Sequence, residues 1–378
     1  MSPRPASPPA IPDRVHAMDG LRAFAMLLGI LLHAAMPFMT FDVPWDVRHR
    51  GRHLIFDAFV GAVHPFRMQL FFLIAGFFAD MLYRRLGPAG FIRHRFKRIF
   101  IPFVAGMIII APLTLRLLSS HLGQFAPLHL WFLEYLLIYY VAALAVVHLM
   151  RSDGGQRCLS RFDSWFATLA GSKWKPLVLA GPLAAIMWFS PMWADVDGGA
   201  GKSLVPGVRG LIYYGLFFSF GWLLHRQPCR LADIEKHVWS YLGWATVAFL
   251  AMGGLLFLES HKAIPYYAWI KLACLIAGAV YTWLMVFGTM GFFLRYLNRP
   301  SPAARYIADS SYWLYLAHLP VVIFLQIQLV KLNWSAFVTF GAINFIALAL
   351  LYVSYHFLVR YTFIGTTLNG PRAPALGS

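Results

Sequence analysis

The chain has 378 residues, of which 60% are hydrophobic and only 12% are charged, whereas a soluble domain carries about 25% charged residues. This composition excludes an ordinary soluble enzyme and predicts a protein that crosses a membrane several times. The net charge of +17 does not indicate nucleic-acid binding, because the basic residues fall mainly in loops between apolar runs. The three cysteines show neither a metal-binding nor a disulfide spacing.

Ten apolar runs are long enough to be membrane spans, and we expect an all-α, polytopic transmembrane bundle built from them. They cover about residues 21–39, 57–83, 99–118, 129–149, 175–193, 208–225, 238–258, 267–292, 311–330 and 335–359. The loops after the even-numbered runs carry more lysine and arginine than the others, which predicts that these loops and both termini are cytoplasmic. We expect a disordered leader at 1–13, a single transmembrane domain at 14–362 and a short flexible tail at 363–378.

The first run begins with Asp19-Gly-Leu-Arg22 and contains one ionisable residue deep inside, His33. Eleven residues correspond to a rise of roughly 16 Å and about three helical turns, so Arg22 and His33 are expected on nearly the same face of one helix. An ionisable side chain within a span is costly and is a candidate functional residue. The structural alternative is a histidine that only hydrogen-bonds to a neighbouring helix.

The second run is polar in its first half and places Arg67 directly before the apolar segment 71–78. Pro65 frees backbone groups close to it, as expected where a helix lines a cavity. An arginine at this depth is costly unless it faces a partner or a wet cavity. Alternatively, Arg67 lies at the outer interface and extends its side chain toward water. The residues leave both interpretations open.

A basic segment, residues 84–98, follows the second run, and Gly87 with Pro88 predicts a turn within it. Arg95 and Arg98 stand just before the third run. On the cytoplasmic side, these arginines could bind lipid phosphates or the phosphates of a nucleotide-bearing donor.

The fourth run opens with His129, Trp131 and Glu134. A carboxylate one to two turns inside a span needs a partner. His129 does not share a helical face with Glu134, so the partner is expected on another helix. His33, Arg67 and solvent are the candidates.

The ninth run carries Tyr312, Tyr315 and His318 at intervals of three residues, so their side chains drift slowly around one side of a helix. One of residues 309–311 is expected to cap this helix. We expect both tyrosines to pack structurally, and His318 is a weaker counterpart of His33.

These motifs together resemble the integral-membrane acyltransferase-3 family. The resemblance rests on Asp19-Gly-Leu-Arg22 followed by His33, on Phe71-Phe-Leu-Ile-Ala-Gly-Phe77, on Arg95-x-x-Arg98-Ile-x-x-Pro102 and on Ser311-Tyr-x-x-Tyr-Leu-x-His318. Two further segments, Phe66-Arg-Met68 and His129-Leu-Trp-Phe-Leu133, resemble one branch of the family, the glucan biosynthesis protein C group. That branch is associated with the succinylation of periplasmic glucans.

The resemblance implies an O-acyltransferase of the bacterial inner membrane. It would move an acyl group, succinyl in this branch, from cytoplasmic acyl-CoA (succinyl-CoA or acetyl-CoA) to a hydroxyl of a periplasmic glucan, with membrane lipids around it. It implies no metal and no tightly bound cofactor. His33 would be the general base or the acyl carrier, and we assign Glu134 to orient or charge it.

The substrate-binding residues are expected to be basic or aromatic. They are Arg22, Arg67, Arg95, Arg98, His129, Trp131, Tyr315 and His318. Arg22 would pair with phosphates of the donor. A bidentate contact between Arg67 and a succinyl carboxylate is our own inference.

Three alternatives stand beside this interpretation. The first is an acetyltransferase of another cell-envelope polysaccharide. The second is a secondary transporter, which predicts repeats with paired broken helices, but no second copy of the first-run pattern is present. The third is a lipid-binding or scaffolding protein without catalysis, which would leave Arg22, His33 and Glu134 without a reason for their cost.

Overall fold

The structure, a computed structural model, describes residues 16–118, 126–190, 201–259 and 266–370, and these ranges contain helices and no strand. The α-helices are α1 (His16–Ala35), α2 (Leu54–Arg95), α3 (Ile101–Leu117), α4 (Trp131–Leu149), α5 (Asp153–Gly171), α6 (Lys175–Trp188), α7 (Val208–His225), α8 (Cys229–Lys236), α9 (Val238–Glu259), α10 (Tyr267–Tyr296), α11 (Pro302–Leu329), α12 (Ala336–Ser354) and α13 (Phe363–Asn369). Two 3-10 turns, η1 (Met36–Phe38) and η3 (Leu128–Leu130), and two π-helical turns, η2 (Phe96–Phe100) and η4 (Tyr355–Val359), extend them.

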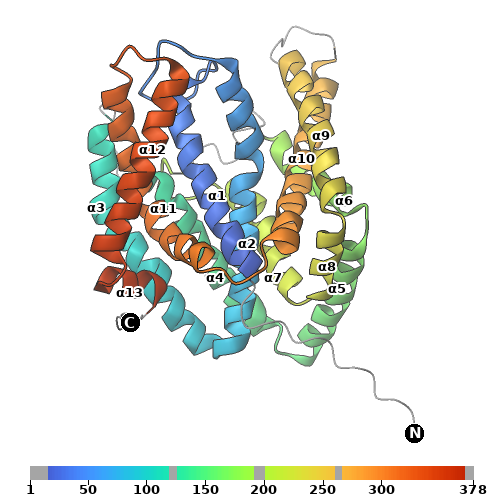
Figure 1. Cartoon of the computed structure of the whole chain (residues 1–378). Coiled ribbons are helices and arrows are strands. Elements are labelled where there is room, and N and C mark those ends of the chain that lie inside the picture. The colour runs from blue at the N-terminus through green and yellow to red at the C-terminus, as the bar shows by residue number, and fades with distance from the viewer. Residues whose placement is uncertain (1–15, 119–125, 191–200, 260–265, 371–378) are drawn as a thin grey trace.

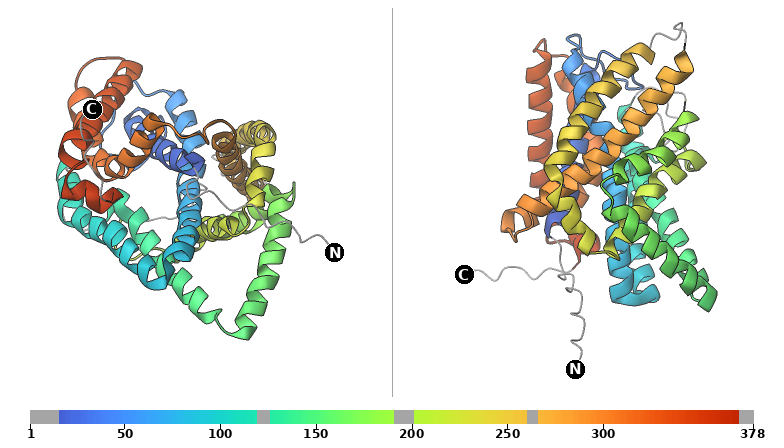
Figure 2. Two further views of the ribbon diagram at one scale, coloured as in Figure 1. Left: turned by 60° about the horizontal axis from the view of Figure 1, so that its bottom comes forward. Right: turned by 90° about the vertical axis from the view of Figure 1, so that its right-hand side faces the viewer.

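The helices form one bundle around α1, which packs against α2, α10, α11 and α12 (Figure 1). Helices α3 and α12 flank one side of the bundle, and α5 and α9 flank the other (Figure 2). Helix α1 begins, and α13 lies, in the lower half of Figure 1, whereas the loop between α1 and α2 lies at the top. The ends of the described chain therefore share one end of the bundle.

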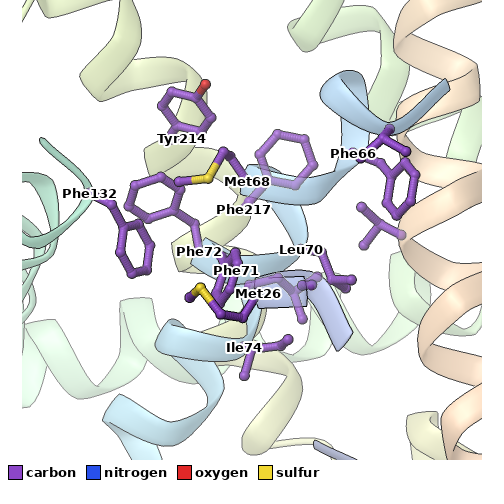
Figure 3. Close-up of a cluster of buried hydrophobic side chains, with 14 of the residues drawn as sticks. Met26, Phe66, Met68, Leu70, Phe71, Phe72, Ile74, Phe132, Tyr214 and Phe217 are labelled. Carbon is purple, nitrogen blue, oxygen red and sulfur yellow. The ribbon is translucent and has the colours of Figure 1, made fainter. Parts of the chain in front are cut away.

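Aromatic side chains fill the space between α1, α2, α4 and α7 (Figure 3). Phe72 of α2 is at their centre, with its ring centroid 4.8 Å from that of Phe132 and 4.8 Å from that of Tyr214. Met26 of α1 is buried in the same core. Aromatic pairs at these distances add attraction beyond the area they bury, so this core joins α2 firmly to α4 and α7.

The predicted turn at Gly87 is confirmed, but the segment after it is not a loop. Gly87 has φ 67° and ψ 179°, values that only glycine adopts without strain. Beyond it the chain resumes a helical course to Arg95 and continues through η2 into α3. The basic segment is therefore helical, and its arginines project from helical turns.

Each of the ten predicted spans overlaps a helix, and residues 191–193 of the fifth span lie outside the described ranges. Among the described residues, seven helical stretches are long and apolar enough to cross a membrane, and one of them, Leu54–Leu117, joins the second and third predicted spans. Helix α6 is shorter than that criterion requires, and α7 is not among the seven. The number of spans and the side on which the termini lie stay predictions.

Two expectations were wrong, one about the start of α11 and one about the C-terminal tail. Helix α11 begins at Pro302, and Ser301 caps it by accepting a hydrogen bond from the backbone N–H of Ala304 at 3.4 Å, so residues 309–311 lie inside the helix. The expected tail begins with a helix, α13, whose last residue Asn369 donates to the backbone oxygen of Asp309 at 2.9 Å. The predicted leader 1–13 and residues 371–378 lie outside the described ranges.

Candidate active site

His33 lies in the last turn of α1, which ends at Ala35. Pro37 follows within η1 and cannot continue the α-helical hydrogen-bond ladder. Carbonyl groups near a helix end need other donors, and the side-chain amide of Gln326 donates to the His33 carbonyl at 2.8 Å. At the other end of α1, Arg22 donates to the Ala308 carbonyl at 3.2 Å. Both residues therefore face α11, as their spacing predicted.

Three histidines from three elements lie in a row. The ring centroid of His318 is 5.3 Å from that of His33 and 5.1 Å from that of His129. His318 Nδ1 is 2.8 Å from the Tyr315 carbonyl oxygen, and His129 Nε2 is 3.0 Å from the Leu316 carbonyl oxygen. A carbonyl only accepts, so each of these nitrogens carries the proton. In the neutral rings, His318 Nε2 and His129 Nδ1 then present lone pairs, and neither has a hydrogen-bond partner among the described residues.

Arg67 lies inside the bundle, and its charge acts on two histidines of this row. Its guanidinium touches Gly29, one turn before His33, where a side chain would collide with it. Its Nε is buried without a hydrogen-bond partner in the described parts of the chain. Its charge acts on both His33 and His318, and no described carboxylate forms an ion pair with it. Such a cation needs an anion or ordered water nearby.

The titratable groups around His33 are basic. The titratable groups that act on it electrostatically are His318, Arg67, His129 and His64, and no carboxylate is among them. Glu134 is partly buried on α4 and makes neither an ion pair nor a hydrogen bond with any described residue. The structure therefore does not bring Glu134 into contact with His33, and the orienting role assigned to it stays a prediction without a contact to support it.

The other two aromatic candidates occupy different places. Tyr315 donates its hydroxyl to the His129 carbonyl at 2.8 Å, which ties α11 to the turn that carries His129. Trp131 makes its ring contacts with Phe72, Tyr135 and Tyr214. Tyr315 thus supports the histidine row, whereas Trp131 belongs to the aromatic core.

Arginines from α1, α2 and η2 form a second cluster at the lower end of the bundle. The charges of Arg95 and Arg22 both act on Arg98, and Tyr312 fixes this turn by donating its hydroxyl to the Arg98 carbonyl at 2.6 Å. Within the described residues, Asp19, 3.8 Å from Arg22, is the only carboxylate in an ion pair with the three. The cluster therefore carries excess positive charge, which suits phosphate groups.

Sequence reasoning missed two residues next to His33. The indole of Trp45, in the loop between α1 and α2, stacks against the imidazole with 5.8 Å between ring centroids and 21° between planes. Its Nε1–H donates to the side-chain oxygen of Gln326 at 3.0 Å. Gln326 was detectable as a polar amide within an apolar run, which is a costly placement; Trp45 had no comparable signal.

A family profile described as an acyltransferase domain, of the acyltransferase 3 type, matches residues 15–356. The chain therefore belongs to the acyltransferase 3 family, and it is a membrane O-acyltransferase. Its curated relatives include glucans biosynthesis protein C of Escherichia coli strain K12, of strain SMS-3-5 / SECEC and of O139:H28 strain E24377A / ETEC. Each is 23% identical over 420 residues, which cover 99% of this chain and 100% of the relative. No solved structure matches the chain.

Proposed function

We propose that this acyltransferase moves a succinyl group from cytoplasmic acyl-CoA to a hydroxyl of a periplasmic glucan. The observation that carries the proposal is Arg67, a guanidinium without an ion-pair partner in the described chain, placed next to His33. A carboxylate at the free end of the acyl group would pair with Arg67 and leave the reacting carbonyl near the imidazole. The glucans named in the curated relatives support the choice of acceptor.

The arginine cluster supports a phosphate-bearing donor. Arg22, Arg95 and Arg98 converge at the end of the bundle opposite His33, and the basic loops predict that this end is cytoplasmic. Phosphates of coenzyme A would replace the carboxylates that the cluster lacks. The acyl group would then extend along α1 toward the histidines.

In the proposed reaction, the acceptor hydroxyl oxygen attacks the thioester carbonyl carbon while His33 takes the hydroxyl proton. The C–S bond breaks as the ester C–O bond forms, and the proton passes to the departing thiolate to give free coenzyme A. The lone pairs of His318 Nε2 and His129 Nδ1 are placed to accept hydrogen bonds from the imidazolium or from acceptor hydroxyls. Arg67 orients the acyl chain.

The test uses the purified full-length protein in lipid nanodiscs with isotopically labelled succinyl-CoA and periplasmic glucans from cells that lack the gene. We expect labelled succinyl ester on the glucan, detected by mass spectrometry, only when protein, donor and acceptor are all present. Transfer from acetyl-CoA but not from succinyl-CoA would overturn the acyl assignment. Esterification of another envelope polysaccharide, with the glucan untouched, would overturn the acceptor.

A further inference from the structure

Trp45 differs from an ordinary interfacial tryptophan because it is held against the candidate base. It lies in the loop at the top of Figure 1, at the end of the bundle opposite the arginine cluster. One face of the indole stacks on His33, and the side chain remains partly exposed. For comparison, Trp334, in the turn between α11 and α12, is 47% exposed and makes no side-chain hydrogen bond or ring contact with the described residues.

A buried amide fixes the indole relative to α1. Gln326 is completely buried and uses both ends of its amide, because its oxygen accepts from Trp45 Nε1–H and its nitrogen donates to the His33 carbonyl. An indole only donates and a carbonyl only accepts, so the amide can take only one orientation here. Any shift of the indole would leave the buried oxygen of the Gln326 amide unpaired, which is unfavourable. Trp45 is thus positioned by the same residue that holds the last turn of α1.

The loop that carries Trp45 is also anchored at both ends. The Asp57 carboxylate accepts from the backbone N–H groups of Thr40 and Phe41, each at 3.0 Å. Further along, the His53 N–H donates to the Phe38 carbonyl at 2.9 Å. A site whose side chains are already ordered loses less entropy when a ligand binds. The loop is therefore built to present the indole in one place.

We propose that Trp45 is the platform on which a pyranose ring of the acceptor stacks, so that a hydroxyl at the ring's edge reaches His33. This inference rests on the proposed function, since it takes the acceptor to be a glycan. A pyranose has an apolar face of C–H groups and a rim of hydroxyls. The indole face turned away from His33 matches the apolar face of the sugar, and a hydroxyl on the rim that extends past the edge of the indole would reach the imidazole stacked on the other side. Gln326 acts as a positioning residue for the indole and for the last turn of α1, which carries the imidazole.

The experiment compares four variants of the full-length protein in nanodiscs: Trp45→Ala, Trp45→Phe, Gln326→Leu and, as the matched control, Trp334→Ala. Binding of de-esterified periplasmic glucans is followed by saturation-transfer NMR, and KM for the glucan is measured with succinyl-CoA. We expect Trp45→Ala to lose the NMR signal of the sugar C–H protons and to raise the KM for glucan about tenfold or more. Trp45→Phe keeps an aromatic face and should stay within about threefold of wild type.

Gln326→Leu should raise the glucan KM without changing acyl-CoA binding, and Trp334→Ala should match wild type in every assay. Normal glucan binding and KM in Trp45→Ala, or an equal loss in Trp334→Ala, would overturn the platform while the proposed function stands. A wild type that binds glucan through Trp45 but transfers no acyl group would overturn the proposed function alone. A wild type that neither binds glucan nor acylates it would overturn both.

Discussion

The guanidinium of Arg67 lies against the α-carbon of Gly29, so α1 has no room for a side chain at that position. We predict that Gly29→Ala displaces the end of the Arg67 side chain and lowers succinyl transfer at least about tenfold. Stability should be retained, because the colliding group is the flexible end of a side chain and alanine favours helix by about 1 kcal/mol over glycine. The measurements are turnover and the thermal midpoint of the purified protein. Gly253→Ala on α9, where the new methyl group would meet no atom within 4 Å outside the local helix backbone, is the control and should leave turnover unchanged.

Arg67 itself should decide which acyl group is accepted. A charge-assisted hydrogen bond contributes about 1.5–3 kcal/mol, so Arg67→Gln should lower kcat/KM for succinyl-CoA by about ten- to a hundredfold. Acetyl-CoA, which has no free carboxylate on its acyl group, should be used no worse than by wild type. Arg67→Lys keeps the charge but not the bidentate geometry, so its kcat/KM for succinyl-CoA should lie between those of wild type and Arg67→Gln. An equal loss of kcat/KM with both donors would show that Arg67 does not recognise the carboxylate of the acyl group.

His33 should be needed for proton transfer and not for folding. Its contact with Gln326 is made by the backbone carbonyl and survives substitution of the side chain. His33→Gln should therefore fold and bind acyl-CoA like wild type, yet lose about 10²–10⁴ in turnover, the usual contribution of a general base. Glutamine retains hydrogen-bonding ability, so near-normal turnover in this variant would make His33 a packing residue.

The arginine cluster should govern donor affinity. We expect Arg22→Ala, and a combined Arg95→Ala and Arg98→Ala variant, to weaken acyl-CoA binding, with each lost phosphate contact costing about 1.5–3 kcal/mol. Added salt should weaken the wild type more than the variants, because screening acts on the charges that the variants lack. Isothermal titration calorimetry gives both quantities. Arg93, exposed on the same basic segment, provides the control: if Arg93→Ala weakens binding as strongly, general surface charge is responsible.

We predict the orientation in the membrane from the basic residues in the loops. Reporter fusions after Arg85 and after Lys331, in the turn between α11 and α12, should report the cytoplasm and the periplasm respectively. Fusions that report the opposite compartments would reverse the bundle and move the arginine cluster to the outside. A cytoplasmic coenzyme A could not then reach it.

Local spacing was enough to predict what lies along one helix. Arg22 and His33 face the same neighbour because eleven residues make three turns, and glycine before proline predicted the break in α2. Helix α5 was missed because its composition is polar, and it is held partly by an ion pair between Asp163 and Arg226, which no local pattern encodes. Ser301 and Pro302, a serine cap followed by proline, signal the start of α11. The prediction placed the start later because the apolar run begins only near residue 311.

Contacts between distant segments could not be predicted in this way. Trp45 and Gln326 are 281 residues apart and Gln326 and His33 are 293 apart; only the packing of α1 against α11 joins them. The same limit explains Glu134, which was paired with His33 because both are costly in a membrane. The free-energy cost of placing a residue in a membrane indicates that it needs a partner, but it does not indicate which residue that partner is.

Arg22 and His33 lie near opposite ends of α1, and this separation would set a minimum length for a donor that binds Arg22 through phosphate and reacts at His33. Eleven residues of α-helix advance roughly 16 Å, so a molecule anchored by phosphate at Arg22 must reach about that far to deliver its carbonyl carbon to His33. In an acyl phosphate the carbonyl is bonded directly to the phosphate oxygen, so it cannot occupy both positions at once. A carrier with a long, thin arm between phosphate and thioester can. The length of α1 would thus select donors that carry the acyl group on a long arm, and acyl phosphates would not be used.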